Sequence, residues 1–203
     1  GYSLGPGESN SDSAPHVRLP GPIIANLDGQ SDPEMILTIP TDADGQSSVD
    51  GAEFIGMEIG NATEIWSFEA SNGFADAPPT AVDTDGDGQH DRVCWITWSE
   101  ENILTRHGHA GCHDLGASPS QAWVKSLERE GGNTNDEIAL SPVAWMDIDG
   151  SGEPEMVVAF GRKVWAYDGE DGTVADIWGG SITVAHRTWS APSFADIDGN
   201  ATL

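Results

Sequence analysis

The sequence predicts an all-β fold built from repeated four-stranded antiparallel units. A recurring motif is the first reason: four segments run proline, short apolar stretch, acidic glycine-containing loop, second apolar stretch. Their loops begin at Asn26, Asp83, Asp147 and Asp196, spaced by 57, 64 and 49 residues. That spacing suits a four-stranded unit with variable connections. The second reason is that helical periodicity is hard to find anywhere along the chain.

Further strands are expected between the loops. An aromatic segment precedes each later loop, and the segments are Ile65–Phe68, Trp123–Leu127 and Ile177–Trp178. Their tryptophans, Trp66, Trp123 and Trp178, are expected to be equivalent. Residues 163–178 alternate apolar and polar side chains around Asp168–Gly172, which predicts a hairpin. The best helical candidate, residues 121–130, is short and fits a strand better.

Length and charge narrow the function classes. The 203 residues carry 34 acidic and 8 basic side chains, a formal net charge of −26. Such a surface repels phosphate backbones and anionic lipid headgroups, so we expect neither nucleic-acid binding nor membrane insertion.

The chain begins at Gly1 and has no long apolar run, as expected of a soluble, mature or excised piece. Residues 1–20 are rich in Gly, Ser and Pro and predict a flexible arm before repeats over 21–203.

The second loop, DTDGDGQHD, has the composition of a cation site. It places carboxylates at loop positions one, three, five and nine, which are Asp83, Asp85, Asp87 and Asp91. Four carboxylates this close need a cation, and a set of oxygen ligands without His or Cys favours a hard ion. A flexible loop suits Ca²⁺ better than Mg²⁺, which requires stricter octahedral geometry. Gln89, at position seven, would contribute its backbone carbonyl.

An EF-hand begins with the same alternating acids but needs a bidentate Glu at position twelve and flanking helices. Position twelve here is Cys94, and residues 93–98 read as a strand. The helical alternative therefore fails on two counts. A solvated acidic turn is the other alternative; it explains one loop but not four with the same flanking strands.

The recurring order of proline, apolar strand, DxDGDGxxD or E, and apolar strand resembles the FG-GAP and VCBS-type repeats of integrin-α-like β-propellers. The resemblance covers the chain from about Pro20 to its end and implies blades in which a loop joins two strands and holds one Ca²⁺. Three complete repeats and a fourth that stops at Leu203 do not close a typical propeller of six to eight blades. The resemblance therefore implies a partial propeller that further blades or a partner chain complete.

The resemblance also implies ligands in the other loops. The third loop would use Asp147, Asp149, Ser151, the carbonyl of Glu153, and Glu155. The first departs from the pattern, with amides at positions one and five, and offers Asn26, Asp28, Gln30, Asp32 and Glu34. The fourth has Asp196, Asp198 and Asn200 but ends before position nine. Ligand carboxylates number four, three and two in the second, third and first loops, so Ca²⁺ affinity should fall in that order.

The two cysteines predict a disulfide. Cys94 and Cys112 are 18 residues apart, a separation compatible with two strands of one blade, and two buried free thiols are the alternative. A disulfide would fit the oxidising cell exterior, which calcium loops independently favour. Residues 106–114, RHGHAGCHD, also suggest a transition-metal site, although a disulfide would consume Cys112.

Calcium does not explain all of the acidity, because only 13 of the 34 acidic residues lie in the loops. A salt-adapted secreted surface is one explanation, and an acidic patch for a basic partner is another.

The leading functional prediction is a non-catalytic, calcium-stabilised extracellular or cell-surface module that binds a protein or glycan partner. No common catalytic constellation is visible. The alternatives are a scaffold within a secreted carbohydrate-active enzyme, a polysaccharide lyase or hydrolase, and a passive structural spacer of a cell-surface assembly.

Overall fold

The computed structural model describes residues 20–41, 51–70, 73–102, 105–127, 141–175, 177–185 and 192–193. Within these residues the protein is all-β, with three four-stranded antiparallel sheets in chain order. Residues 1–19 of the arm predicted over residues 1–20, and the predicted fourth acidic loop, lie outside the described residues.

Each sheet is a meander in which consecutive strands pair. The first contains β1 (Ile23–Ala25), β2 (Glu34–Thr41), β3 (Gly51–Glu58) and β4 (Glu64–Glu69). The second contains β5 (Thr80–Val82), β6 (Arg92–Asn102), β7 (Thr105–Asp114) and β8 (Ser120–Leu127). The third contains β9 (Ala144–Met146), β10 (Glu155–Phe160), β11 (Lys163–Asp168) and β12 (Ser181–Thr183). The four-stranded repeat is thus confirmed, and residues 120–127 form a strand as expected.

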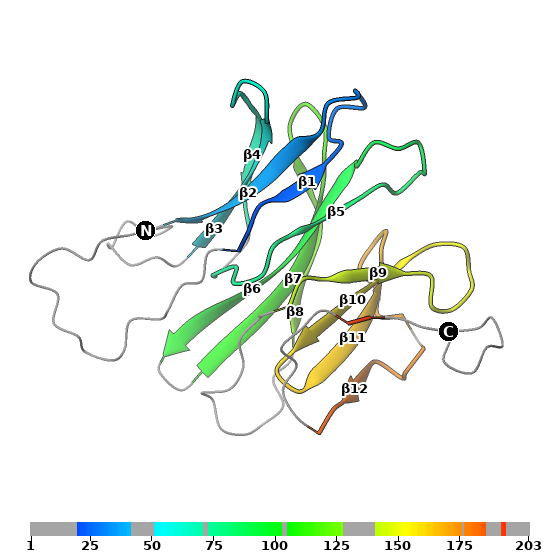
Figure 1. The fold of residues 1–203 in the computed structure, drawn as a ribbon. Helices are drawn as coiled ribbons and strands as arrows, with labels where there is room; N and C mark the ends of the chain where they lie inside the picture. Colours follow the sequence, from blue (N-terminus) through cyan, green and yellow to red (C-terminus); the bar gives the residue numbers. More distant parts are fainter. Residues whose placement is uncertain are drawn as a thin grey trace, which may run out of the picture.

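The second sheet lies between the other two (Figure 1). An apolar cluster between the first and second sheets includes Ile36, Phe54, Trp66 and Trp95. A larger cluster between the second and third includes Trp98, Trp123, Met156 and Phe160. The second sheet therefore packs an apolar face against each of its neighbours, which explains why the described residues form two cores. The described sheets form a series and no closed ring is seen among them, so a propeller stays a prediction.

Trp66 and Trp123 are equivalent, as the sequence predicted. Trp66 pairs with Gly56 just where the β3–β4 register shifts, and Trp123 pairs with Cys112 just where the β7–β8 register shifts. Both indoles are buried, with 4% and 5% of their surface exposed. The two β-bulges therefore place a tryptophan at the same point of successive sheets.

The prediction for Trp178 is wrong. Residues 177–180 form a turn, and the edge strand β12 begins only at Ser181. Gly179 and Gly180 have φ of 66° and 112°, a left-handed backbone that a strand does not accommodate. Of the predicted hairpin, the structure confirms the Asp168–Gly172 turn and a single bridge from Tyr167 to Val174. In the turn, the Asp168 N–H donates to the Thr173 carbonyl.

Across the part of the chain that the structure describes, no helix has the length and apolarity that a membrane crossing requires.

Candidate metal sites in the repeated loops

The three described acidic loops occupy the same place in their sheets. Each connects the first strand to the second: β1 to β2, β5 to β6, and β9 to β10. Position nine is the first residue of the second strand in the first and third loops, Glu34 and Glu155, and immediately precedes it in the second, Asp91. The two strands therefore fix both ends of every loop.

Position one folds each loop through the same hydrogen bond. A side-chain oxygen there accepts the N–H of the glycine at position four, at 2.9 Å in the first loop, 2.7 Å in the second and 2.8 Å in the third. These glycines, Gly29, Gly86 and Gly150, have φ of 75°, 76° and 76°. Because residues with a Cβ rarely adopt this backbone, the glycine allows the chain to turn back over position one.

Positions three and nine complete the repeated scheme. The position-three carboxylates, Asp28, Asp85 and Asp149, accept the N–H two residues later. The position-nine carboxylates accept the N–H of position two, at 2.6 Å for Glu34, 3.0 Å for Asp91 and 2.7 Å for Glu155. Every loop thus turns its carboxylate oxygens toward its own interior, although the three sequences differ at several positions.

The second and third loops bring three acidic groups close together. Asp83, Asp85 and Asp87 form one triad, and Asp147, Asp149 and Glu155 form the other. Within each triad one carboxylate oxygen from every residue lies within 4.8 Å of the others, which is close enough to hold one metal ion. Of the position-nine residues, Glu155 therefore joins its triad, whereas Asp91 accepts a hydrogen bond from the Thr84 hydroxyl.

The two triads differ in electrostatics. Hydrogen bonds from the backbone of Gly88 and Gly86 lower the pKa of the half-buried Asp83 carboxyl, because they favour its charged form. Burial raises the pKa of Glu155, and the carboxylates of Asp149 and Asp147 raise it further. Glu155 is the most buried of the six triad acids, with 4% of its surface exposed, so within the triads its charge most needs a neighbouring cation.

The first loop forms no such triad among the described residues. Its position-one residue is Asn26, whose amide nitrogen donates 2.8 Å to the carbonyl of Gly88 in the second loop. In return, the Gln89 amide donates 3.1 Å to the Leu27 carbonyl, and the His90 N–H donates to the Asn26 carbonyl. The first loop is thus fastened to its neighbour by hydrogen bonds.

This bridge was missed in the sequence, where Asn26 counted as an imperfect metal ligand. Asparagine at position one, in place of the Asp of the other loops, was the available signal, since its amide can donate to a carbonyl and an ionised carboxylate cannot.

No model of a known protein family matches the chain, and no curated protein matches it significantly.

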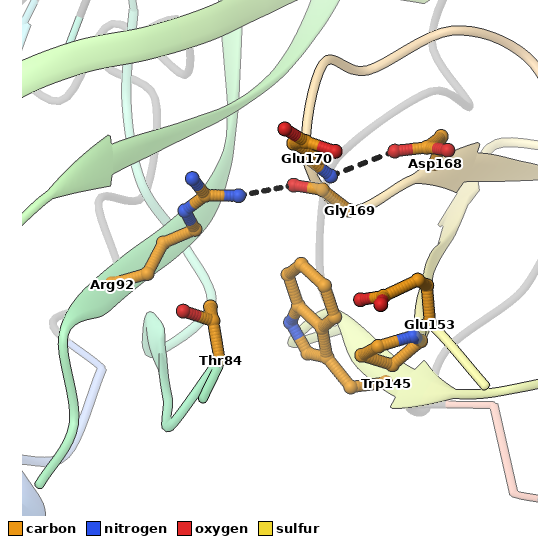
Figure 2. Close-up of a pocket in the computed structure, with 8 residues that line it drawn as sticks. Thr84, Arg92, Trp145, Glu153, Asp168, Gly169 and Glu170 are labelled. Carbon is orange, nitrogen blue, oxygen red and sulfur yellow. Dashed lines mark hydrogen bonds between the residues drawn. The ribbon is translucent and has the colours of Figure 1, made fainter. Parts of the chain in front are cut away.

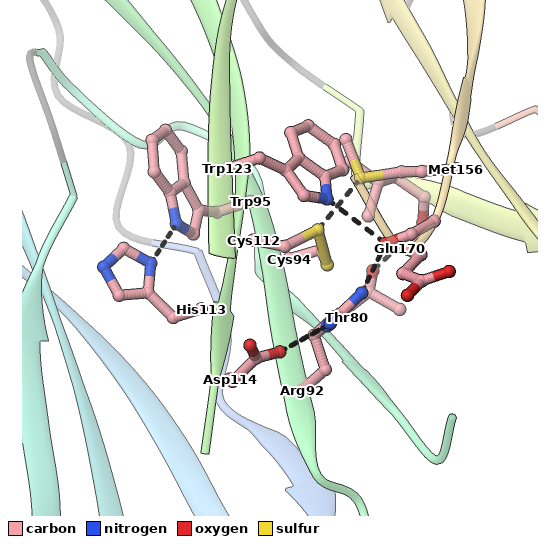
Figure 3. The surroundings of a disulfide bond; sticks show 12 residues. Thr80, Arg92, Cys94, Trp95, Cys112, His113, Asp114, Trp123, Met156 and Glu170 are labelled. Atoms are coloured by element: carbon pink, nitrogen blue, oxygen red, sulfur yellow. Dashed lines mark hydrogen bonds and ion pairs between the residues drawn. A yellow bond between two sulfur atoms is a disulfide. The ribbon is translucent and has the colours of Figure 1, made fainter. Parts of the chain in front are cut away.

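The cysteines predicted to pair are joined. Cys94 of β6 and Cys112 of β7 lie directly opposite each other and form a disulfide, with no free cysteine in the described chain (Figure 3). Both are fully buried, and Cys112 Sγ lies 3.6 Å from Met156 Sδ of the third sheet. Disulfides are typical of oxidising compartments, including the cell exterior.

The histidines of β7 do not form a metal cluster among the described residues, and the disulfide occupies Cys112. His113 instead belongs to the core: its Nδ1 accepts the Trp95 indole N–H at 3.2 Å, and its ring stacks on Phe68 with centroids 3.9 Å apart.

The predicted ligands of the fourth loop, Asp196, Asp198 and Asn200, lie outside the described residues.

Proposed function

We propose that the chain is a calcium-stabilised extracellular binding module made of β-propeller blades. The main support for this proposal is the geometry of the three described loops. They share a hydrogen-bond scheme that turns carboxylates inward, and two of them bring three acidic groups together. Oxygen-only ligands on a flexible loop suit Ca²⁺. In this proposal, Asp83, Asp85 and Asp87 hold one ion and Asp147, Asp149 and Glu155 hold another.

The ion has a structural role in this proposal. Without it, three carboxylates face one another within 4.8 Å and repel, and the connection between the first two strands of the sheet loosens. Calcium at about ten times the dissociation constant of a site would stabilise the fold by about 1.4 kcal/mol per site. The disulfide supports an extracellular location, where such sites are filled.

Calorimetric Ca²⁺ titration of the EDTA-treated chain, paired with thermal melting, tests the proposal. We expect two or more saturable sites and a higher melting temperature with calcium. Asp85→Ala and Asp149→Ala should each remove one site, and Glu64→Ala, an exposed acid on β4, should remove none. Absence of binding and an unchanged melting temperature would leave the loops as hydrogen-bonded turns and refute the calcium role.

A further inference from the structure

A pocket of about 420 Å³ lies between the second and third sheets (Figure 2). Its size falls in the range of small-ligand sites. It is bordered by the second loop, the start of β6, the third loop, β9 and the turn after β11. The lining residues that decide its chemistry are Thr84, Arg92, Trp145, Glu153, Asp168 and Glu170.

The single basic group of this lining is already engaged. Arg92 Nη2 lies 2.6 Å from Asp114 Oδ1, Nε donates to the same oxygen, and Nη1 donates to the Gly169 carbonyl. Asp114 therefore balances the charge of Arg92. The three acidic side chains of the lining remain, and ionised carboxylates only accept hydrogen bonds. The pocket consequently favours a ligand that donates hydrogen bonds and carries positive charge.

Trp145 adds an aromatic surface. Figure 2 shows its indole between the Arg92 side of the pocket and the Glu153 carboxylate. A Cβ added at Gly169 would lie 2.3 Å from Trp145 Cζ3, so the missing side chain at this position leaves room for the indole. The face of an indole attracts cations more strongly than that of any other aromatic side chain.

A single metal ion does not fit this arrangement. In the described chain, the acidic groups close enough to share one ion are the two loop triads, and the pocket acids Asp168 and Glu170 belong to neither. Acceptors that are spread around an aromatic ring suit a longer cation with several N–H donors and an apolar stem.

We propose that this pocket binds an organic cation: an ammonium or guanidinium group on an alkyl chain, as in a Lys or Arg side chain of a partner protein or in a free diamine. The proposal deepens the binding function proposed above and rests on it, because Thr84 and Glu153 belong to two of the candidate calcium loops. The net charge of −26 would also draw such cations toward the surface.

Titration calorimetry of the 203-residue chain with calcium at physiological salt tests the ligand class. The probes are N-acetyl-lysine methylamide, N-acetyl-arginine methylamide and cadaverine, with N-acetyl-norleucine methylamide and methyl glucoside as neutral controls. We expect saturable binding of the cations alone. Tighter binding of the capped amino acids would assign the ligand to a protein, and tighter binding of cadaverine would assign it to a free amine. Equal binding of norleucine, or binding of the glucoside alone, would overturn the proposal.

Variants locate the site. Glu170→Gln removes one exposed pocket charge, and Glu64→Gln on β4 is the control with the same charge change. We expect Glu170→Gln to weaken binding about threefold or more and Glu64→Gln to leave it unchanged. Trp145→Leu should weaken binding similarly and Trp145→Phe less, with melting curves to verify folding. Equal weakening by Glu170→Gln and Glu64→Gln would show attraction to overall charge and refute the pocket.

The experiments can refute the cation pocket and the calcium role independently of each other. Calcium binding without cation binding would refute the pocket alone. Cation binding by a chain that binds no calcium would refute the calcium role and leave the pocket standing.

Discussion

Single residues hold neighbouring sheets together in this protein, and His113 is the clearest case. The side chain comes from β7 of the second sheet and stacks on Phe68 of the first. Because its Nδ1 accepts the Trp95 N–H, that nitrogen has no proton. Burial lowers the pKa of His113 to about 4, against a smaller opposing effect of Asp114. The neutral ring is therefore part of the contact between the two sheets.

Stability should consequently fall as the medium is acidified through the range where the unfolded histidine takes up a proton. The unfolded side chain titrates near its ordinary pKa of 6.5, whereas the folded one resists protonation down to about 4. The contribution of His113 is thus fully present above pH 6.5 and decreases toward pH 4. Urea unfolding from pH 7.5 to 4.5 would show a steeper loss for the wild type than for His113→Gln. Parallel curves would contradict this role.

Gly56 is a second residue whose identity the packing determines. It pairs with Trp66, and a Cβ at this position would lie 2.5 Å from Trp66 Cε2. We expect Gly56→Ala to reduce the free energy of unfolding by about 1–3 kcal/mol, because the buried indole has no room to move. Gly60→Ala, with nothing within 4 Å of the added Cβ, is the matched control for denaturant unfolding. Equal effects of the two substitutions would show that chain flexibility, not the clash, is responsible.

At the scale of elements, the repeat made the first two strands of each sheet predictable. A proline, an apolar stretch and a glycine-containing acidic loop define a turn between two strands by local rules alone, and the structure places β1–β2, β5–β6 and β9–β10 there. The edge strand of the third sheet was mispredicted, because the apolar pair Ile177 and Trp178 outweighed the two glycines that follow it. The pocket and the Asn26 bridge depend on contacts that local rules do not supply, such as Asn26 with Gly88, 62 positions apart, and Arg92 with Gly169, 77 positions apart. Asparagine at position one hinted at a different role for that residue but not at its partner.

The disulfide secures the central hairpin. It links β6 to β7 between residues 18 apart, in the sheet that contacts both neighbours. Constraining an unfolded loop of this length stabilises the fold by about 3 kcal/mol. We expect Cys94→Ala combined with Cys112→Ala to lower the free energy of unfolding by about this amount in denaturant titrations. Reductant should destabilise the wild type and leave the double variant unchanged; a wild type insensitive to reductant under unfolding conditions would contradict a closed disulfide.

For the whole molecule, the imbalance of 34 acidic against 8 basic residues is the dominant electrostatic fact. Like charges repel across a compact surface more than across an unfolded chain, so the excess lowers stability unless cations reduce it. Salt screens this repulsion, with a Debye length of about 10 Å at 0.1 M, whereas bound calcium neutralises charge at particular loops. Salt and calcium therefore both weaken this repulsion, salt by screening it everywhere and calcium by neutralising particular loops.

We expect the melting temperature of the EDTA-treated chain to rise as NaCl increases from about 0.05 to 0.5 M, over which the Debye length shrinks severalfold. In saturating calcium the rise should be smaller, because the two triads, where repulsion is strongest, would already be neutralised. Circular dichroism melts with and without calcium measure both slopes. KCl should reproduce NaCl, since screening depends on ionic strength and not on the identity of the ion. Equal slopes with and without calcium would show that repulsion within the triads does not limit stability, and that the remaining surface acids determine the response to salt.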